Sequence, residues 1–216
     1  MQSILNGWCK RVLGVKLSNP NAAVAGELGQ YPLIVFRKIQ MLKYWTKIVS
    51  GPRDRYRNVM YQNLKNNVDS NAYAQYKNWA LEIRRILIEI GMEGLWHSEH
   101  LETSAEQFIA KARCILVDLY ITVWRLDMAE KEKLQTHNLY KVTFQHELYL
   151  SNIKSVKLRV AMTRLRLSSH NLAIETGRYH PRTVRHHRYC RQCDRLDIED
   201  EYHFMCKCIK HKDVVF

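Results

Sequence analysis

A chain of 216 residues can bury one hydrophobic core together with one small additional module. Its 46% hydrophobic and 25% charged residues are ordinary for a globular protein and argue against global disorder, and no apolar run reaches the roughly 18 residues that a membrane span needs. The net charge of +13 is unusual and indicates a polyanionic partner, with nucleic acid ahead of an acidic membrane surface.

The N-terminus has no basic start followed by an apolar stretch, so we expect no signal peptide. The protein is therefore expected to be intracellular, nuclear or cytoplasmic, without a membrane partner. Under those conditions the six cysteines are expected to be thiols and metal ligands, and not disulfides.

The spacing of apolar residues predicts helices almost throughout, which places the fold in the mostly α class. Few prolines and glycines, and no alternating Val/Ile/Thr runs, leave nothing that requires an extensive sheet. The first two predicted helices cover residues 3–15 and 32–50, with a loop between them. Their apolar positions are Ile4, Trp8, Val12 and Leu13 in the first helix, and Val35, Ile39, Leu42, Trp45 and Val49 in the second.

The middle of the chain contains a polar and basic segment, residues 53–66, and two more predicted helices. Ser70 or Asn71 can cap the first of these helices, and Gly91 ends it. A capping box in residues 103–106 (TSAE) begins the longest helix, and a less regular stretch, residues 136–150, follows. The apolar stripes, which we expect to be core, are Tyr76, Trp79, Ile83, Ile86, Leu87 and Ile90, and then Phe108, Ala112, Ile115, Leu119, Val123 and Leu126.

The composition changes after residue 151. Residues 154–189 carry nine lysines and arginines against one acid, Glu175. Leu158, Ala161, Leu165 and Leu167 alternate with basic residues, which predicts an amphipathic helix whose apolar face docks and whose other face is basic. A solvated charged face normally mixes both signs, and this one does not, so we predict phosphate contacts. The predicted contacts are Lys157, Arg159, Arg164, Arg166, Arg178, Arg182, Arg185 and Arg188, with Tyr179 and Tyr189 available to stack on unpaired bases.

Four potential metal ligands lie close together near the end of the chain. Cys190 and Cys193 form a Cys-x-x-Cys pair that lets two thiolates converge on one ion, and His203 and Cys208 can supply the opposite edge. Three thiolates and one imidazole suit the tetrahedral preference of zinc. Four protein ligands leave no position for an activated water, so we predict a structural zinc site of the zinc-knuckle type.

The fourth ligand of this site is open to choice, because Cys206 lies two residues before Cys208. A spacing of four residues from His203 favours Cys208, and Cys206 is then expected to be a thiol that packs inward; His211 is a weaker substitute. The loop has few apolar residues, so bound zinc is expected to supply folding energy, with residues 204–205 (FM) as a small core.

Other candidate chemistry is less specific. Cys114 lies on the apolar face of the longest predicted helix and is expected to be a buried thiol, and Cys9 is expected to be similar. The run GELG in residues 26–29 lacks the strand context and the lysine of a phosphate-binding loop. His97 and His100 flank an acid and could form a ligand cluster, but a polar loop between helices explains them as well, and we favour the loop.

The same residues carry a resemblance to a known family. Residues 165–179 (LRLSSHNLAIETGRY) resemble a signature segment of non-LTR (LINE-type) retrotransposon polyproteins, where it lies downstream of the reverse transcriptase domain. The cysteine pair, residues 198–204 (IEDEYHF) and Cys208 are similar to the C-terminal CCHC knuckle of those proteins. Residues 9–15 (CKRVLGV), 26–33 (GELGQYPL) and 43–45 (KYW) are similar to the connector between polymerase and knuckle.

The resemblance implies three parts: a helical connector domain (1–150), a basic helix and linker (151–189) and a zinc knuckle (190–216). It also implies a non-catalytic chain, since the aromatic-x-Asp-Asp motif that holds magnesium in these polymerases is absent. The acids in residues 197–201 are expected to act locally, countering basic neighbours or orienting the ligand histidine. The sequence departs from the family at Cys206, where an apolar residue is usual, and at Ile209, where a proline is usual.

By this resemblance, the chain is expected to hold template RNA or target DNA during target-primed reverse transcription. Two alternatives remain open from the sequence. The knuckle can serve protein–protein assembly with the upstream reverse transcriptase domain of the polyprotein. The chain can also be a decayed copy of the element without a selected activity.

Overall fold

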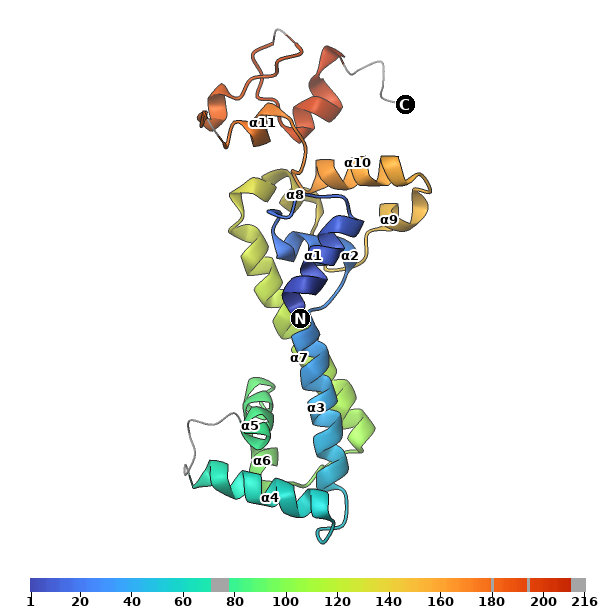
Figure 1. Ribbon diagram of the computed structural model, residues 1–216, viewed down its shortest axis with the longest axis vertical. Helices are drawn as coiled ribbons and strands as arrows, with labels where there is room; N and C mark the ends of the chain where they lie inside the picture. The colour runs from blue at the N-terminus through green and yellow to red at the C-terminus, as the bar shows by residue number, and fades with distance from the viewer. Residues whose placement is uncertain (71–77, 180, 194, 211–216) are drawn as a thin grey trace. The chain divides into compact units, whose positions relative to one another are not determined.

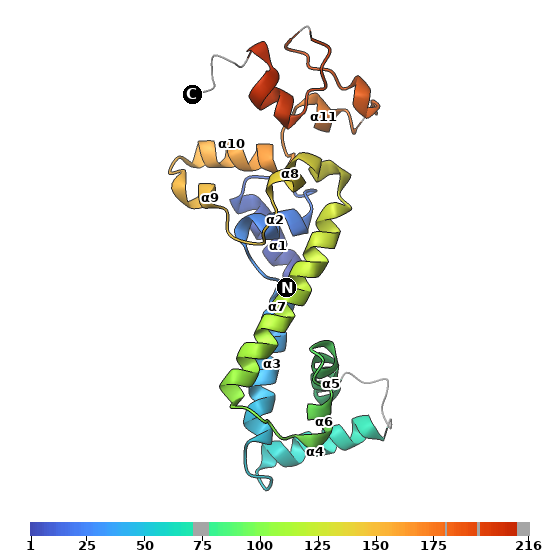
Figure 2. The same ribbon diagram turned by 180° about the vertical axis from the view of Figure 1, so that it is seen from behind.

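The computed structural model of the chain describes residues 1–70, 78–179, 181–193 and 195–210 (Figures 1 and 2). Within these ranges the chain is helical and contains no extended strand, and the isolated β-bridges pair Leu28 with His146 and Tyr189 with Ile198. The predicted mostly α fold class is confirmed. In the described part of the chain no helix is both long and apolar enough to cross a membrane.

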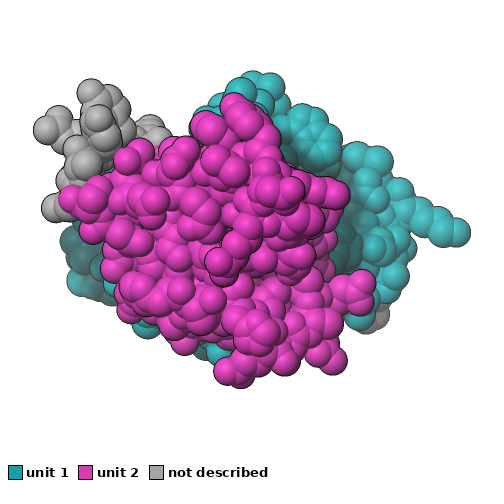
Figure 3. All heavy atoms as spheres, turned by 90° about the horizontal axis from the view of Figure 1, so that it is seen from below, with its two compact units in different colours: residues 1–30, 123–216 teal, residues 31–122 magenta. Residues whose placement is uncertain are grey.

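The chain forms two compact units: unit 1 comprises residues 1–30 and 123–216, and unit 2 comprises residues 31–122 (Figure 3). This division does not follow the predicted boundaries after residues 150 and 189, because the beginning of the chain packs with its last third. The helices of unit 1 are α1 (Gln2–Val12), α2 (Asn21–Leu28), α8 (Gln135–Tyr140), α9 (Leu148–Asn152), α10 (Val156–Arg166) and α11 (Ala173–Thr176), with short turns η1 (Glu132–Leu134), η2 (Arg185–His187) and η3 (His203–Lys207). Those of unit 2 are α3 (Leu33–Val49), α4 (Tyr56–Asp69), α5 (Trp79–Glu89) and α6 (Gly94–Ser98), and α7 (Ala105–Ala129) passes from unit 2 into unit 1 at residue 123.

Unit 2 has a hydrophobic core built from the stripes that the sequence predicts for α3 and α5. Trp45 is fully buried, and its indole N–H donates to the hydroxyl of Tyr61 at 3.0 Å. The first turn of α5 is capped by Asn78, whose side chain accepts from the amide of Ala80, so the predicted cap at Ser70 is wrong. Ser70 instead ends α4, and the alternative cap Asn71 lies outside the described residues.

The capping box of α7 and the second half of its apolar stripe differ from the prediction. The reciprocal capping pair is Ser104 with Gln107, one residue later than predicted. Beyond Leu116 the buried residues are Trp124 and Met128, whereas the predicted Leu119, Val123 and Leu126 are exposed. Burial in α7 thus follows positions four residues apart, from Phe108 through Leu116 to Trp124 and Met128. Trp124 is held there because its ring packs edge-on against Phe144 and its indole N–H donates to the carbonyl of Ala22. In α1 the predicted apolar positions Ile4, Trp8 and Val12 are likewise exposed, and Leu13 is buried.

Helix α10 packs closely on the turn that follows α1. Gly14 lies in this turn with a φ of +67°, and a Cβ atom there would lie 2.6 Å from a methyl group of Val160. Both the backbone conformation and the collision oppose a larger residue. Figures 1 and 2 show α10 between the α1–α2 pair and the C-terminal segment of unit 1.

We therefore expect Gly14→Ala to lower the free energy of unfolding by about 1–3 kcal/mol, through the left-handed φ and the contact with Val160. The matched control is Gly7→Ala, since Gly7 lies inside α1 with open space around its Cα, and alanine is the better helix former by about 1 kcal/mol. Chemical denaturation of both variants measures the difference. Equal stabilities would contradict close packing of α10 at Gly14.

Candidate metal centre

The four predicted metal ligands meet at one point. The ligand atoms of Cys190, Cys193, His203 and Cys208 all lie within 4.8 Å of one another, and all four residues are buried. The sulfur atoms of Cys190 and Cys208 are 3.9 Å apart, and the Cys193 sulfur is 3.4 Å from Nε2 of His203. A tetrahedral zinc ion with ordinary bond lengths requires edges of about 3.8 Å between two sulfurs and about 3.6 Å between sulfur and nitrogen. The group therefore has the size and the donor chemistry to hold a metal ion such as zinc.

Short-range contacts hold these ligands in place. The amide of Gln192 donates to the sulfur of Cys190 at 3.4 Å, and the amide of Cys190 donates to the carbonyl of Asp197 across the antiparallel bridge at Tyr189. Turn η3 is π-helical, and the amide of Cys208 bonds to the carbonyl of His203, five residues back, which returns the last cysteine to the group.

Two acids of the predicted acidic approach lie next to the histidine. The side chain of Asp200 accepts from the backbone amide of His203 at 2.7 Å, and a carboxylate oxygen of Asp197 lies 3.6 Å from its Nδ1. The Nε2 atom, on the opposite side of the ring, faces Cys193. Among the described residues Nδ1 has no hydrogen-bond partner, so Asp197 supplies a nearby negative charge and does not fix the ring by a hydrogen bond. Of the roles predicted for the acids, the structure therefore shows an orienting contact only at the backbone of His203.

Two other acids join the ligand group to the rest of unit 1. The carboxylate of Glu199 accepts from the amide of Ala173 at 2.6 Å. The carboxylate of Glu201 accepts from Ser168, His170 and Thr136 at 2.7–2.8 Å. Burial alone would raise the pKa of Glu201, but these hydrogen bonds outweigh it and lower the pKa to about 2. The signature segment and the ligand group therefore form one hydrogen-bonded structure, and the knuckle is not a loosely attached appendage.

A buried carboxylate determines how α10 is oriented. Glu27 of α2 is fully buried, and Arg166 makes a bidentate contact with it at 3.0–3.2 Å. Tyr149 and His137 contact the same carboxylate at 2.8 and 2.9 Å. Burial would raise the pKa of Glu27, but the hydrogen bonds from His137 and Arg166 and the positive charge of Arg166 lower it to about 2. Arg166 also pairs with Glu147 at 2.7 Å.

The predicted orientation of α10 is consequently wrong. Its apolar residues Leu158 and Ala161 are exposed and Leu165 is half-buried, whereas Thr163 is buried and Arg166 points into unit 1. Of the four predicted apolar positions, only Leu167, at the end of α10, is buried. A charged pair that satisfies a buried carboxylate outweighs the burial of a leucine that can remain partly solvated. The sequence pattern alone does not reveal this, because Glu27 lies 139 positions before its partner.

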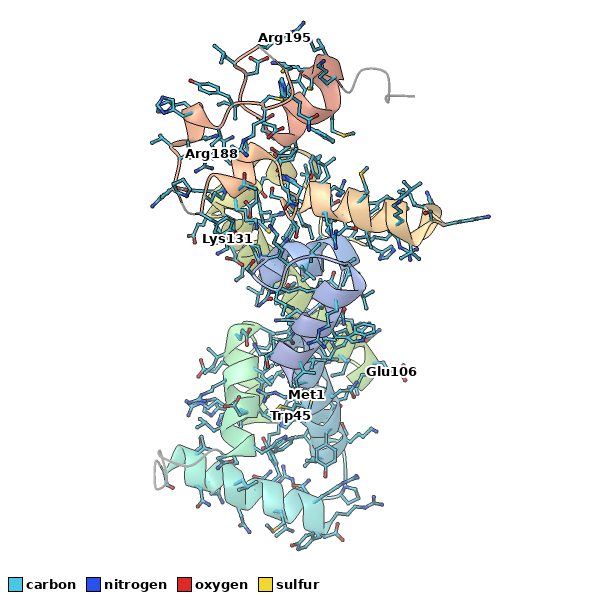
Figure 4. All side chains as sticks on the ribbon, turned by 45° about the horizontal axis from the view of Figure 1, so that its top comes forward. Met1, Trp45, Glu106, Lys131, Arg188 and Arg195 are labelled. Carbon is cyan, nitrogen blue, oxygen red and sulfur yellow. The ribbon has the colours of Figure 1, made fainter. Side chains whose placement is uncertain are left out.

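Several of the predicted phosphate contacts have internal partners. Arg188 is only 9% exposed and donates to the carbonyls of Thr183 and Ile174 (Figure 4). Arg178 is half-buried and pairs with the carboxylate of Glu175 at 3.2 Å. Arg159 is half-buried and donates to the carbonyl of Ile153, and Tyr179 is exposed but donates to Glu175. Arg188 and Arg166 both direct their guanidinium groups to partners inside unit 1, which leaves neither available to contact phosphate.

A different set of cations remains at the surface. Lys157, Arg164 and Arg182 are exposed, and Arg185 is half-buried; among the described residues none of the four is within ion-pair distance of a carboxylate. Arg164 does donate to the backbone carbonyl of Gly14 at 2.6 Å. The pKa of Arg188 is lowered, first by burial and then by the positive charges of Arg178, Arg185 and Arg182. The field around this segment is therefore strongly positive.

Two cations that the sequence analysis passed over lie next to the ligands. Arg191 and Arg195 follow Cys190 and Cys193 in the cysteine loop, and both are exposed. Figure 4 shows Arg195 at the outer edge of the C-terminal segment, while Arg188 lies among its turns. Arg191 lies inside the Cys-x-x-Cys run and Arg195 two residues after it. This position was a signal that could have found them, because a ligand loop must itself be near the surface of so small a module.

The remaining cysteines have mixed outcomes. Cys9 is buried, as predicted, whereas Cys206 and Cys114 are exposed and those two predictions are wrong. Of the two predicted small-core residues, Phe204 is half-buried and Met205 is exposed. Among the described residues no second group of potential ligands comes together. The predicted loop at residues 97–100 is wrong at its start, because His97 lies in helix α6, and Glu99 and His100 follow that helix. There the carboxylate of Glu99 pairs with Lys65 at 2.7 Å.

Comparison with known proteins gave no matching family model, no matching curated protein and no matching solved structure.

Proposed function

We propose that the chain is a zinc-dependent, non-catalytic nucleic-acid-binding module. The observation that carries this proposal is the buried Cys3His group beneath an exposed loop segment rich in arginine. Two distances between ligand atoms, 3.9 Å between the sulfurs of Cys190 and Cys208 and 3.4 Å between the Cys193 sulfur and His203 Nε2, are close to those of tetrahedral zinc. The neighbouring acids Glu199 and Glu201 are turned inward to hydrogen-bond donors, whereas Arg191 and Arg195 are exposed.

The proposed interface comprises exposed side chains around this group together with the half-buried Arg185. We define it as the C-terminal basic surface, made of Arg182, Arg185, Arg191 and Arg195 with the rings of His186, His187 and Tyr189. His187 stacks loosely with Tyr189, with ring centroids 6.1 Å apart. Exposed arginines supply phosphate contacts, and exposed rings can stack on unpaired bases, a combination that suits single-stranded nucleic acid. Lys157 and Arg164 on α10 are candidates for an extension of the same strand.

The resemblance to the post-polymerase region of non-LTR retrotransposon polyproteins supports the same conclusion. Its signature segment and its knuckle are the two parts that Glu199 and Glu201 join by hydrogen bonds. We propose that the chain acts as such a tail or a truncated derivative of one, holding template RNA or target DNA beside the reverse transcriptase domain.

The test is a fluorescence-anisotropy titration of single-stranded RNA and of duplex DNA at several salt concentrations. Replacing Arg191 and Arg195 by glutamine should weaken binding and reduce the slope of log K against log salt by about 1.4 for a single strand or about 1.8 for a duplex. The control pair Arg11→Gln and Arg125→Gln removes the same charge from exposed positions of unit 1 and should leave the slope nearly unchanged.

Chelation of the metal should also weaken binding, because the loop that carries these arginines depends on its ligands. Binding that persists unchanged in metal-stripped protein would separate the basic surface from the metal group. Absence of binding by the zinc-loaded protein would exclude the proposed function. It would favour the two alternatives, a protein–protein assembly module or a decayed copy without a selected activity.

A further inference from the structure

The exposed side of α10 forms one wall of a groove of about 870 Å³ within unit 1. Leu158, Ala161, Met162 and Leu165 line it from the helix, at the i, i+3, i+4 and i+7 spacing of a single helical stripe. Leu172 of the signature segment and Met205 of η3 line the far side. The groove therefore lies between the basic helix and the metal-ligating segment, and its walls are mainly apolar.

The opposite side of α10 is fully occupied, which is why the groove stays open. Val160 is packed on Gly14, Thr163 bonds to the hydroxyl of Tyr149, and Arg166 contacts Glu27. Turning α10 to bury its leucines would expose or abandon all three contacts. Leu158 therefore remains 62% exposed on a helix that cannot rotate. Large apolar side chains gathered in one depression, not scattered singly, mark an interaction site.

The rim of the groove is positively charged. Lys16 and Arg164 line it, and Lys157 adjoins Leu158 on α10; all three are exposed. No aspartate or glutamate lines the groove. Among the described residues no carboxylate lies within ion-pair distance of these three cations, so their charges are not compensated within the chain. An occupant with negative charges at its edges would be attracted by all three.

We infer that this groove is a docking site for an amphipathic helix of a protein partner, with leucine-like side chains on one face and acidic residues on the other. The apolar stripe of α10 provides an apolar wall for the leucine-like side chains of the partner helix. The uncompensated cations attract the acidic residues on the other face of that helix. This inference does not rest on the proposed nucleic-acid function. The two share Lys157 and Arg164, which are also candidates for phosphate contact, whereas Leu158 and Leu165 belong to the groove alone.

Three other occupants fit the groove less well. A nucleic-acid backbone requires cations along its whole path, whereas Lys16 and Arg164 are the only lysines or arginines among the described residues that line this groove. A membrane surface cannot enter a concave site as a helix can. A second copy of the chain would bring another +13 of net charge against a basic rim.

The experiment uses the full zinc-loaded chain and a fluorescein-labelled peptide of about 15 residues, which as a helix is about 22 Å long. The peptide carries leucine at i, i+3, i+4 and i+7 and glutamate on the opposite face; a matched peptide has lysine in place of every glutamate. We expect the glutamate peptide to bind at least tenfold more tightly than the lysine peptide. We also expect Leu158→Glu to weaken glutamate-peptide binding at least tenfold.

The control variant is Leu148→Glu, because Leu148 is even more exposed, on α9, and does not line the groove. Circular dichroism and metal content of both variants verify the fold, and Leu158 is exposed enough to accept the substitution. Equal binding of the two peptides, or equal binding by wild type and Leu158→Glu, would overturn the inference. The inference would also be overturned if the glutamate peptide did not bind and Leu158→Glu instead abolished RNA binding, vesicle binding or self-association. The groove would then belong to that other occupant.

Discussion

Replacement of Glu27 by alanine is expected to lower the free energy of unfolding of unit 1 by about 3–5 kcal/mol, one of the largest effects of any single substitution in this chain. The carboxylate is fully buried and is contacted by Arg166, His137 and Tyr149. Its removal leaves the guanidinium of Arg166 with only Glu147 as a counter-ion and leaves a cavity between α2 and α10. Urea denaturation followed by near-ultraviolet circular dichroism measures the change. Glu130→Ala, at an exposed acid, is the control and should change the stability by less than about 0.5 kcal/mol.

The same carboxylate predicts how stability depends on pH. The pKa of Glu27 is about 2 in the folded chain against an ordinary value of 4.5, and that of Glu201 is lowered to the same extent. A depressed carboxylate stabilises the fold fully above its unfolded pKa, and this contribution disappears as pH falls from about 4.5 toward 2. The stability difference between wild type and Glu27→Gln should therefore shrink steadily between pH 5 and pH 2.5. A difference independent of pH would show that the buried charge does not stabilise the fold.

Replacement of Cys190 or Cys208 by serine is expected to reduce bound zinc from one ion per chain to near zero in protein freed of excess metal. Each substitution takes one of four ligands from a buried group whose ligand atoms lie within 4.8 Å of one another, and the loop has little apolar material to hold it otherwise. Metal content by mass spectrometry and release of zinc to a chromogenic chelator measure the effect. Amide hydrogen exchange in residues 188–208 should accelerate at the same time.

The control for this experiment is Cys206→Ser. Cys206 lies within η3 but is exposed, whereas Cys208 is buried 3.9 Å from the sulfur of Cys190. We expect the Cys206 variant to keep one zinc ion and wild-type affinity. Loss of zinc from Cys206→Ser together with retention in Cys208→Ser would reverse the assignment of the fourth ligand.

A feature of this structure could be predicted from the sequence when the residues that determine it lie close together in the chain, and could not when they lie far apart. The ligand group was predictable because all four residues and their neighbouring acids fall within 19 positions, from Cys190 to Cys208. The α3 stripe was predictable because its burial follows helical spacing. The orientation of α10 was not, since it depends on Glu27, far away in the sequence, and apolar periodicity says nothing about a distant carboxylate. The prediction that the apolar stripe of α1 is buried was wrong for a related reason. Apolar spacing predicts that a helix has an apolar face, but it does not show that another element packs on that face.

The arrangement of unit 1 has a consequence for the order in which the chain can fold. Residues 31–122 are inserted between its two parts, so the first 30 residues leave the ribosome long before α8, α9 and α10 exist. Until Arg166 and Tyr149 are made, Glu27 lacks the donors that its buried position requires and stays solvated. Joining the two parts across an unfolded insert of this length costs about 4 kcal/mol of chain entropy. Unit 2, whose contacts are contiguous in sequence, can fold during that wait. A fragment that begins after residue 30 would carry the metal ligands but not the carboxylate on which α10 is built, and an arginine-lined cavity would take its place.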